Sequence, residues 1–435
     1  MTYHPVDVVE VRAWDALVGA VALDPTTNFY AFEYAGEWLS RGVELAPLHL
    51  PVREGIFVFP ELSPKTFHRL PALLADSLPD RFGNALVDAW MEDNGVSKEA
   101  VTPLDRLAYA ADRATGALTF RPPAGPDAEV LTAVQLADLV TAARAQVSGK
   151  VGDAPDAHEA LRQLIVVGTS AGGARAKAVI AYNPTTGQIR SGQLDMPEGF
   201  EPWLIKLDGV TGDLTRETDP FTGGGPYGLI EYAYYLMATA AGVNMSQSRL
   251  LPEGPRTHFL TRRFDRTVGN ERIHMQSLCA MAHLDFNLVG THSYGTYLRM
   301  VRDLGMTDDE LQQAFRRIVF NVAAVNRDDH TKNLAFLLAE GGRWQLSPAY
   351  DLTHAHNPSG QWTSNHQMGV NGKFDGIAQD DLSVLADRYQ VANYRRIMQE
   401  VLETVGEWPD FAAQAGVPRE VTQSIQADLA KNTPR

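Results

Sequence analysis

The chain has 435 residues, and at about 100–200 residues per domain this length predicts two to four folding units rather than one small module. Apolar residues make up 44% and charged residues 21% of the chain, so there is ample material for a buried core and disorder is not expected. With 38 Lys and Arg against 53 Asp and Glu, the net charge of −15 opposes direct contact with the phosphate backbone of nucleic acid.

The first ten residues contain no cationic stretch followed by an apolar run, so they lack the pattern of a signal peptide. No run approaches the ~18 consecutive apolar residues that a membrane-spanning helix needs. Cys279 is the single cysteine, which excludes an intrachain disulfide and a multi-cysteine metal site. We therefore expect a cytoplasmic protein with no membrane partner.

Apolar and polar residues alternate in short runs over the N-terminal part of the chain, as they do in strands. The predicted strands cover residues 6–11, 20–23, 29–34 and 55–59. From 70 to 93 the apolar positions change to helical spacing, which Pro79 interrupts once. A subdomain that combines a β-rich part with helices is therefore expected over residues 1–147.

Two Gly- and Pro-rich stretches, residues 116–127 and 149–156, are the best linker candidates, and a helix is expected between them at 133–145. Strand-like runs then return together with one long helix. The runs cover residues 164–167, 178–182, 203–207 and 257–260, and the helix covers 227–241. From about residue 274 onward helical spacing dominates, so a mainly helical unit is expected at the C-terminal end.

The stretch Asn-Arg-Asp-Asp-His-Thr-Lys-Asn at 326–333 carries the strongest chemical signal in the chain. It follows a predicted helix that begins after Thr307, because Glu310 completes a capping-box pattern there. Asp328 and Asn333 are five residues apart, the spacing of the kinase catalytic loop. In that loop the Asp accepts the proton of the attacking hydroxyl and the Asn binds a magnesium ion.

A hairpin is predicted directly after this loop, with strands at 334–338 and 343–346. It returns the chain to the loop and is expected to place Asp351 beside Asn333, where a carboxylate can act as a second magnesium ligand. Lys332, inside the loop, would add a cation beside a transferred phosphoryl group.

Residues 168–177, Gly-Thr-Ser-Ala-Gly-Gly-Ala-Arg-Ala-Lys, join two strand-like runs. The backbone N–H groups of such a loop can approach phosphate without interference from Cβ atoms, although a glycine-rich turn is often only structural. The loop is not a Walker A motif, because Ala and Arg follow its last glycine. Lys206 lies in a predicted strand, where it can bind nucleotide phosphates or reach solvent from a strand edge. Glu231, on the next predicted helix, is a possible partner for it.

These motifs occur in the same order as in HipA-type serine/threonine protein kinase toxins of type II toxin–antitoxin systems, which the chain resembles from about residue 5 to 400. The resemblance is carried by residues 70–83, 170–177, 203–206, 262–266, 326–333 and 347–351. It implies an α+β fold, in which a β-rich N-terminal subdomain precedes a two-lobed protein-kinase-like core that is related to lipid kinases. The implied domains are 1–147, an N-lobe with the glycine loop at 148–266, and a helical catalytic C-lobe at 267–435.

The resemblance also implies roles for individual residues. Asp328 would be the catalytic base, with Lys332 as a second catalytic residue that supplies a positive charge, and Asn333 and Asp351 would hold Mg²⁺. The residues implied to bind ATP are Ser170, Ala171, Gly172, Gly173, Lys177, Lys206, Arg263, Phe264 and His330, with Lys206 at the phosphates and the backbone near Arg263 and Phe264 at adenine. Ser170 matches the position at which such kinases autophosphorylate, and negative charge added there would repel ATP.

Further implications concern partners. The family implies a helix-turn-helix antitoxin of the HipB type, contact with DNA only through that antitoxin, and a protein substrate that the family suggests is an aminoacyl-tRNA synthetase. The chain departs from the best-known members at Arg262, where they have Glu, and at residues 276–278, where they have Gln-Glu-Asp. These departures bear on nucleotide contacts and substrate choice rather than on phosphoryl transfer.

Two other classes of function are compatible with the residues. Asp328, Asp329 and His330, with His354 and His356, have spacings that suit Zn²⁺ or Mn²⁺ in a metal-dependent phosphohydrolase. That alternative leaves Lys206 and the glycine loop without a role. The other alternative is a non-catalytic co-repressor that acts only through a DNA-binding antitoxin.

Several remaining polar residues are expected to be structural. His330 is expected to support its loop by hydrogen bonds. His354, His356 and His366 are expected to be ordinary loop histidines, and Cys279 is expected to pack in the core because apolar residues surround it.

Overall fold

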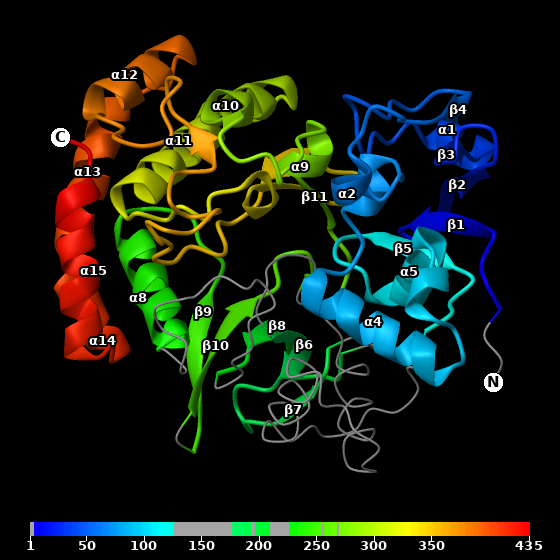
Figure 1. Ribbon diagram of the computed structural model, residues 1–435, viewed down its shortest axis with the longest axis horizontal. Helices are drawn as coiled ribbons and strands as arrows, with labels where there is room; N and C mark the ends of the chain where they lie inside the picture. Colours follow the sequence, from blue (N-terminus) through cyan, green and yellow to red (C-terminus); the bar gives the residue numbers. More distant parts are fainter. Residues whose placement is uncertain (1–3, 126–175, 193–195, 209–225, 255, 268) are drawn as a thin grey trace.

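The N-terminal part of the chain forms an antiparallel sheet with the strand order β4-β3-β2-β1-β5 (Figure 1). The protein is described from a computed structural model that covers residues 4–125, 176–192, 196–208, 226–254, 256–267 and 269–435. The strands are β1 (Val8–Ala13), β2 (Ala16–Asp24), β3 (Phe29–Tyr34), β4 (Ile56–Phe57) and β5 (Leu118–Arg121). The four strands predicted before residue 60 are confirmed, and β5 lies in a stretch predicted as a linker. Its four residues are too few to show a pattern, but they pair with β1.

Five α-helices lie between β3 and β5 in the sequence. They are α1 (Gly36–Arg41), α2 (Pro64–Phe67), α3 (Ala72–Ala75), α4 (Arg81–Asp93) and α5 (Pro103–Ala110). The predicted interruption at Pro79 separates α3 from α4, and Asp80 begins α4 by accepting a hydrogen bond from the Gly83 N–H at 2.7 Å. The first turn of α4 is therefore capped by a side chain.

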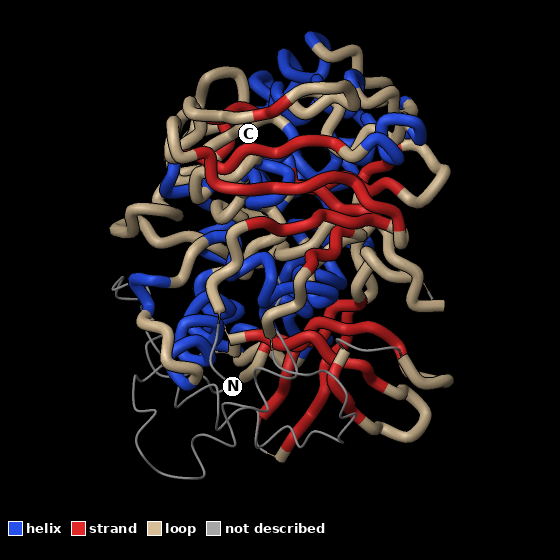
Figure 2. The backbone as a smooth tube through the Cα atoms, turned by 90° about the vertical axis from the view of Figure 1, so that its right-hand side faces the viewer, coloured by secondary structure: helices blue, strands red, loops and turns tan. Residues whose placement is uncertain are grey.

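A second antiparallel sheet has the order β7-β6-β8-β10-β9. Its strands are β6 (Lys177–Tyr182), β7 (Ile189–Ser191), β8 (Glu201–Lys206), β9 (Ser248–Glu253) and β10 (Arg256–Arg262). The long helix predicted near 227–241 is α8 (Tyr227–Ala240), which packs against β9 and β10. Figure 2 shows the strands of the two sheets as separate groups. The predicted helix at 133–145, the predicted strand at 164–167 and the boundary at residue 147 lie outside the described residues.

The C-terminal part is mainly helical, as predicted. Its helices are α9 (Leu278–Met281), α10 (Tyr294–Asp303), α11 (Asp308–Ala323), α12 (Gln379–Arg388), α13 (Tyr394–Gly406), α14 (Trp408–Ala415) and α15 (Arg419–Asn432). The capping box of Thr307 and Glu310 is present and begins α11. The predicted hairpin is β13 (Ala335–Leu338) with β14 (Trp344–Leu346), and β11 (His274–Ser277) extends it to three strands. A short parallel pair joins β12 (His292–Ser293) to β15 (Met368–Gly369).

Two apolar cores hold these parts together. The larger one joins the N-terminal sheet to the C-terminal helices, so that Trp38 and Phe320 belong to one continuous cluster. In the smaller one, α4 packs on the second sheet, with Phe82 beside residues such as Trp203 and Ile205. The N-terminal subdomain therefore packs on both remaining units and fixes their relative position. Within the described residues, no helix combines the length and the apolar character needed to cross a membrane.

Cys279 lies in the larger core, as the sequence predicts. Burial is the main cause that raises the pKa of its thiol to about 12. We expect iodoacetamide at about pH 8 to leave the folded protein unmodified and to modify Cys279 only after denaturation, because the thiolate is the reactive form. Mass spectrometry of the intact chain measures the outcome. Modification of the folded protein at the rate of a free thiol would contradict this prediction.

Candidate functional site

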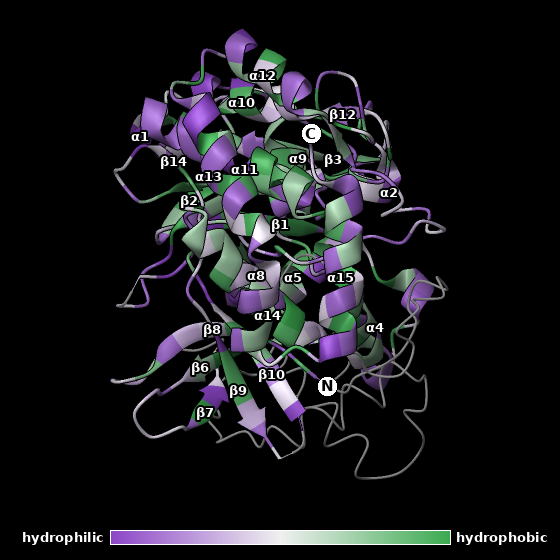
Figure 3. Ribbon diagram, turned by 90° about the vertical axis from the view of Figure 1, so that its left-hand side faces the viewer, coloured by the Kyte–Doolittle hydropathy of each residue, from purple (hydrophilic) through white to green (hydrophobic). Residues whose placement is uncertain are grey.

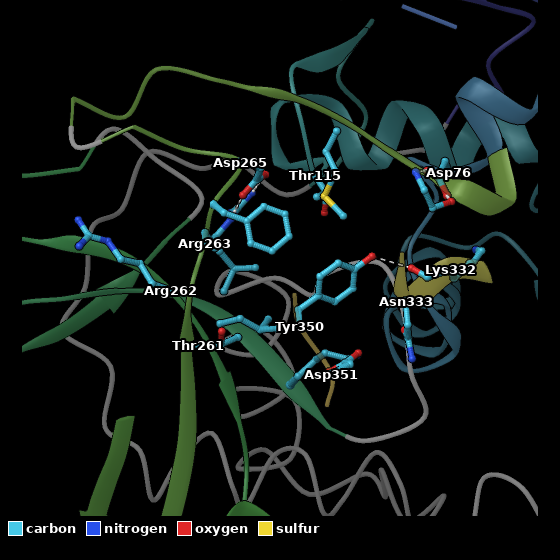
Figure 4. A pocket seen from close by; sticks show the side chains of 16 residues that line it. Asp76, Thr115, Thr261, Arg262, Arg263, Asp265, Lys332, Asn333, Tyr350 and Asp351 are labelled. Carbon is cyan, nitrogen blue, oxygen red and sulfur yellow. Dashed lines mark hydrogen bonds and ion pairs between the residues drawn. The ribbon is translucent and has the colours of Figure 1, made fainter. Parts of the chain in front are cut away.

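A pocket lies where the second sheet, residues 263–266 after β10 and the mainly helical C-terminal part meet (Figure 4). We call residues 263–266 the hinge. We call the pocket the central pocket; residues that line it include Asp76, Thr115, Lys177, Thr261, Arg262, Arg263, Phe264, Ser277, Lys332, Asn333, Tyr350 and Asp351. Six of the predicted site residues are among them: Lys177, Arg263, Phe264, Lys332, Asn333 and Asp351. Segments that are far apart in sequence thus supply one cavity.

Lys206 ends β8 and is held between two carboxylates. Its Nζ lies 2.5 Å from Glu231 Oε1 on α8, and it also forms an ion pair with Asp351. Burial by itself would lower the pKa of Lys206, but Asp351 and Glu231 outweigh it and raise that pKa above its usual value. Of the two possibilities for Lys206, the strand-edge lysine that reaches solvent is therefore wrong, and the possible partner Glu231 is confirmed as a contact.

Asp351 carries both electrostatic and backbone signs of a functional residue. Burial favours its neutral form, but the cations Lys206 and Lys177 prevail and lower its pKa to about 2. Its backbone φ angle is 54°, in the left-handed region that a non-glycine residue rarely adopts. Strain of this kind persists where surrounding contacts fix the chain. Asp351 is thus an ionised carboxylate held at a defined place in the central pocket.

The catalytic-loop candidate 326–333 follows α11 and contains two neighbouring aspartates with different environments. The Asp329 carboxylate is fully buried and accepts hydrogen bonds from Tyr294 Oη (2.7 Å), His366 Nδ1 (2.8 Å) and the Gln367 N–H (2.7 Å). By contrast, 48% of the Asp328 side chain is exposed, and its one hydrogen bond among the described residues comes from Gln367 Nε2 at 3.3 Å. Asp329 therefore anchors the loop, and Asp328 is the one of the two carboxylates that is open to solvent.

The loop ends in a single 3₁₀ turn, Thr331–Asn333. The turn brings Asn333 Nδ2 back to donate to the Asp328 carbonyl oxygen at 2.8 Å. Since the amide nitrogen is used in this way, the amide oxygen is the group that Asn333 can offer to a cation. Tyr350 Oη donates to the Lys332 carbonyl oxygen at 2.7 Å and ties the turn to the chain just before Asp351.

The ring of His330 does not support the loop by the predicted hydrogen bonds. Its Nε2 lies 3.8 Å from Asp328 Oδ1, and its Nδ1 is buried without a hydrogen-bond partner among the described residues. Instead the ring packs against Phe286, over which the Lys332 ammonium also lies. The predicted hydrogen-bond support comes from the backbone alone, since the His330 carbonyl oxygen accepts from the Asn333 N–H at 2.9 Å, while an aromatic ring far away in sequence holds the imidazole. Neither Asp328 nor His330 lines the central pocket directly.

The hinge after β10 is fixed by a buried carboxylate that sequence reasoning missed. Asp265 pairs with Arg263 in two hydrogen bonds of 2.9 and 2.7 Å, and it also accepts from Arg266 Nη1 and from the Gly116 N–H at 2.8 Å each. Burial would raise the pKa of Asp265, but the guanidinium groups of Arg263 and Arg266 lower it far below its usual value. Phe264 packs against Tyr350 next to this network. The hinge is therefore tied to the N-terminal subdomain.

The N-terminal subdomain also reaches the site from α3 and α4. Asp80 lies 3.2 Å from Lys177 Nζ, with both side chains buried, and Asp76 accepts two hydrogen bonds of 2.7 Å from Ser277. Sequence reasoning assigned no role to these aspartates. The one signal available was their place within residues 70–83, the stretch that resembles the N-terminal signature of the kinase toxins.

Two family models match this chain. The model of the HipA N-terminal domain matches residues 9–121, and that of the HipA-like C-terminal domain matches residues 169–433, more than half of the chain. The chain belongs to the HipA family. Its α+β fold agrees with the predicted class, and the glycine-loop residues Ser170, Ala171, Gly172 and Gly173 lie outside the described residues of this HipA-family protein.

The comparisons with individual proteins are more distant. A chain in the solved Shewanella oneidensis MR-1 toxin–antitoxin complex of HipA, HipB and operator DNA has a TM-score of 0.66 and 17% identity, and the match covers 98% of this chain and 95% of that one. Y4dM of Sinorhizobium fredii, whose name describes it as a kinase, is 27% identical over 149 residues, 33% of this chain. The match spans 35% of the length of that relative.

The histidines after Asp351 are not ordinary loop residues in this HipA-family protein. His354 Nε2 and His356 Nδ1 lie 2.9 and 2.7 Å from the same carboxylate oxygen of Asp428 on α15. His366, as described above, anchors Asp329. Among the described residues no group of three or more His, Cys, Asp or Glu side chains is arranged to hold a metal ion, so the cluster of Asp328 with His354 and His356 is not formed.

Proposed function

We propose that this protein is an ATP- and Mg²⁺-dependent serine/threonine protein kinase that inhibits growth as the toxin of a toxin–antitoxin pair. The observation that carries the proposal is the ion pair of Lys206 with both Glu231 and Asp351, because Asp351 lines the central pocket together with Asn333, the last residue of the loop that carries the exposed Asp328. Kinases use a strand lysine paired with a helix glutamate, a metal-binding aspartate, and a catalytic-loop Asp and Asn. Membership of the HipA family and the fold of the Shewanella toxin–antitoxin chain support it.

The residues present fit the cofactors that the proposal requires. Asp351 offers an ionised carboxylate and Asn333 an amide oxygen, both lining the central pocket, and Mg²⁺ prefers such oxygen ligands. Bound Mg²⁺ would neutralise charge on the phosphates of ATP. Lys206 would contact those phosphates, and the hinge residues Arg263 and Phe264 would border the adenine.

In the proposed reaction, Asp328 accepts the proton of a serine or threonine hydroxyl. The hydroxyl oxygen then forms a bond to the γ-phosphorus of ATP, and the bond from that phosphorus to the bridging oxygen of ADP breaks. Lys332 and Asn333 line the central pocket, where Lys332 would add a positive charge, and Asn333 closes the turn of the loop by its bond to the Asp328 carbonyl oxygen.

The test is incubation of the purified full-length protein with Mg²⁺ and ATP labelled at the γ-phosphate. We expect label on protein, including Ser170 of the same chain, and dependence on added Mg²⁺. A metal-dependent phosphohydrolase would instead release phosphate without a stable phosphoprotein. If neither the chain nor proteins of a cell extract take up label, the kinase proposal fails.

Lys206→Met is expected to lower the rate of label transfer by about 10²–10³-fold, the cost of removing one preorganised charge at a reacting group. The substitution also leaves Glu231 and Asp351 as two like charges without the cation between them. Lys206→Arg, which keeps the positive charge, is the matched control and is expected to retain more activity. Initial rates of labelling, with circular dichroism to check folding, measure the effect. A Met variant that labels at the wild-type rate would show that Lys206 does not act on the nucleotide.

The proposal includes a HipB-type helix-turn-helix antitoxin as partner, with DNA contacted only through it. The acidic charge of −15 favours this indirect route, because a basic companion would have to supply the phosphate contacts.

The substrate is proposed to be an aminoacyl-tRNA synthetase in the cytoplasm. Phosphoproteomics after brief expression tests the substrate. If Asp351→Asn relieves growth arrest, toxicity depends on phosphorylation. In a purely co-repressing role, the variant would arrest growth as strongly as the wild type.

A further inference from the structure

The last helix, α15, presents polar side chains to the two chain segments that form the site. Hydrophilic and hydrophobic residues alternate along α15, which lies at the edge of the molecule (Figure 3; Figure 1). Asp428 accepts from His354 Nε2 and His356 Nδ1, which follow Asp351 by three and five residues. One carboxylate oxygen thus holds both histidines of the segment after Asp351.

One turn further along α15, Asn432 continues this contact to the catalytic loop. Its Nδ2 donates to Asp428 Oδ1 at 2.8 Å, and its Oδ1 accepts from Arg327 Nη2 at 3.1 Å. The Arg327 side chain is buried, and it also pairs with Asp375 and donates to the Ser364 carbonyl oxygen. Arg327 directly precedes Asp328. A continuous chain of hydrogen bonds therefore runs from the residue before Asp328, through α15, to the histidines after Asp351.

The backbones of the two segments are paired as well. The Arg327 N–H donates to the Ala355 carbonyl oxygen at 3.0 Å, and the Ala355 N–H donates to the Val325 carbonyl oxygen at 3.2 Å. Ala355 lies between the two histidines that Asp428 holds. Main-chain pairing joins the segments directly, and α15 fixes the side chains on both sides of that pairing.

We infer that Asp428 and Asn432 on α15 are positioning residues that hold the Asp328 loop and the Asp351 segment in the geometry needed for phosphoryl transfer. This inference rests on the proposed kinase function. Neither residue lines the central pocket, so each acts through Arg327 or through the histidines. Reactions of this type are sensitive to misplacement of about 1 Å, and the loss of a supporting partner around a metal site costs about 10–100-fold.

Asp428 is suited to this role because it stays ionised. Burial would raise its pKa, but the hydrogen bonds from His354 and His356 lower it to about 2. An ionised carboxylate accepts hydrogen bonds more strongly than a neutral one, so both imidazoles are held firmly above that pKa. Even neutral imidazoles can donate here, since each uses one ring N–H toward Asp428.

The experiment compares Asp428→Ala and Asn432→Ala with Gln426→Ala, an exposed position on the same helix. Hydrogen–deuterium exchange of the full-length protein is measured for peptides that contain residues 325–333 and 351–357. We expect faster exchange of both peptides in the first two variants and no change in the control. For phosphoryl transfer we expect kcat to fall about 10–100-fold, because the contacts of α15 that support the two segments are lost. The KM for ATP should stay within about threefold of the wild type, because the residues that would contact the nucleotide remain.

A merely structural role would lower the unfolding midpoint without this separation of kcat from KM. Asp428→Asn, which keeps one acceptor oxygen, is expected to restore part of kcat, and it replaces the alanine variant if that one does not fold. The inference is overturned if hydrogen–deuterium exchange of both peptides is the same in the variants as in the wild type. It is also overturned if the wild type transfers phosphate and the variants have the same kcat. If the wild type transfers no phosphate, the kinase proposal fails, and the exchange measurement alone decides whether α15 holds the two segments.

Discussion

Asp328→Asn is expected to lower the rate of phosphoryl transfer by about 10²–10⁴-fold, the contribution typical of a positioned general base. Asn has the same shape but accepts no proton at neutral pH, so the hydroxyl of the substrate would remain protonated. Since the Asp328 side chain is half exposed and has one long hydrogen bond to Gln367, the substitution removes few contacts that stabilise the fold. The unfolding midpoint should stay close to that of the wild type.

The neighbouring Asp329→Asn is the matched control. Its carboxylate is fully buried and accepts from Tyr294, His366 and the Gln367 N–H, so its loss should lower stability as well as activity. Labelling rates with γ-labelled ATP and thermal unfolding of both variants measure the contrast. Phosphoryl transfer that persists in Asp328→Asn would exclude Asp328 as the base. Equal loss of stability in the two variants would show that the loop is not anchored by Asp329 alone.

The largest effect on stability is expected for Asp265→Ala, at about 3–5 kcal/mol of unfolding free energy, because the substitution leaves buried guanidinium groups without their carboxylate. Asp265 joins Arg263, Arg266 and the Gly116 N–H, and so it connects the hinge of the central pocket to the N-terminal subdomain. Urea unfolding at neutral pH measures the effect. Asp387→Ala, an exposed site on α12, is the control and is expected to change stability little.

The pH dependence of this effect has a defined sign. The folded-state pKa of Asp265 lies far below its unfolded value, so its contribution to stability is fully present above about pH 4 and is lost as the pH falls further. The difference in unfolding free energy between the wild type and Asp265→Ala should therefore be constant at neutral pH and narrow only in acid. A difference that narrows already between about pH 8 and 6 would point to another titrating group.

Much of the fold follows from local patterns. Alternation predicted the first four strands, the spacing after Thr307 predicted α11, and Pro79 marked the break before α4. These signals are local because strand and helix periods are set by neighbouring residues. Strand β5 was missed, since four residues carry too little pattern and its pairing with β1 is a long-range contact.

For the site, the sequence by itself determined the chemistry and the order of the motifs: Asp328 and Asn333 five residues apart, and Asp351 after a hairpin. Only the tertiary structure decided which groups meet. Lys206 pairs with Asp351 across 145 residues, Asp329 rather than Asp328 is buried, and Asp428 on the last helix holds the histidines after Asp351. Hydrogen bonds and ion pairs of buried groups depend on distance in space, and the burial of a residue depends on the whole core. Neither property produces a periodic pattern in the amino-acid sequence, so local patterns could not predict these contacts.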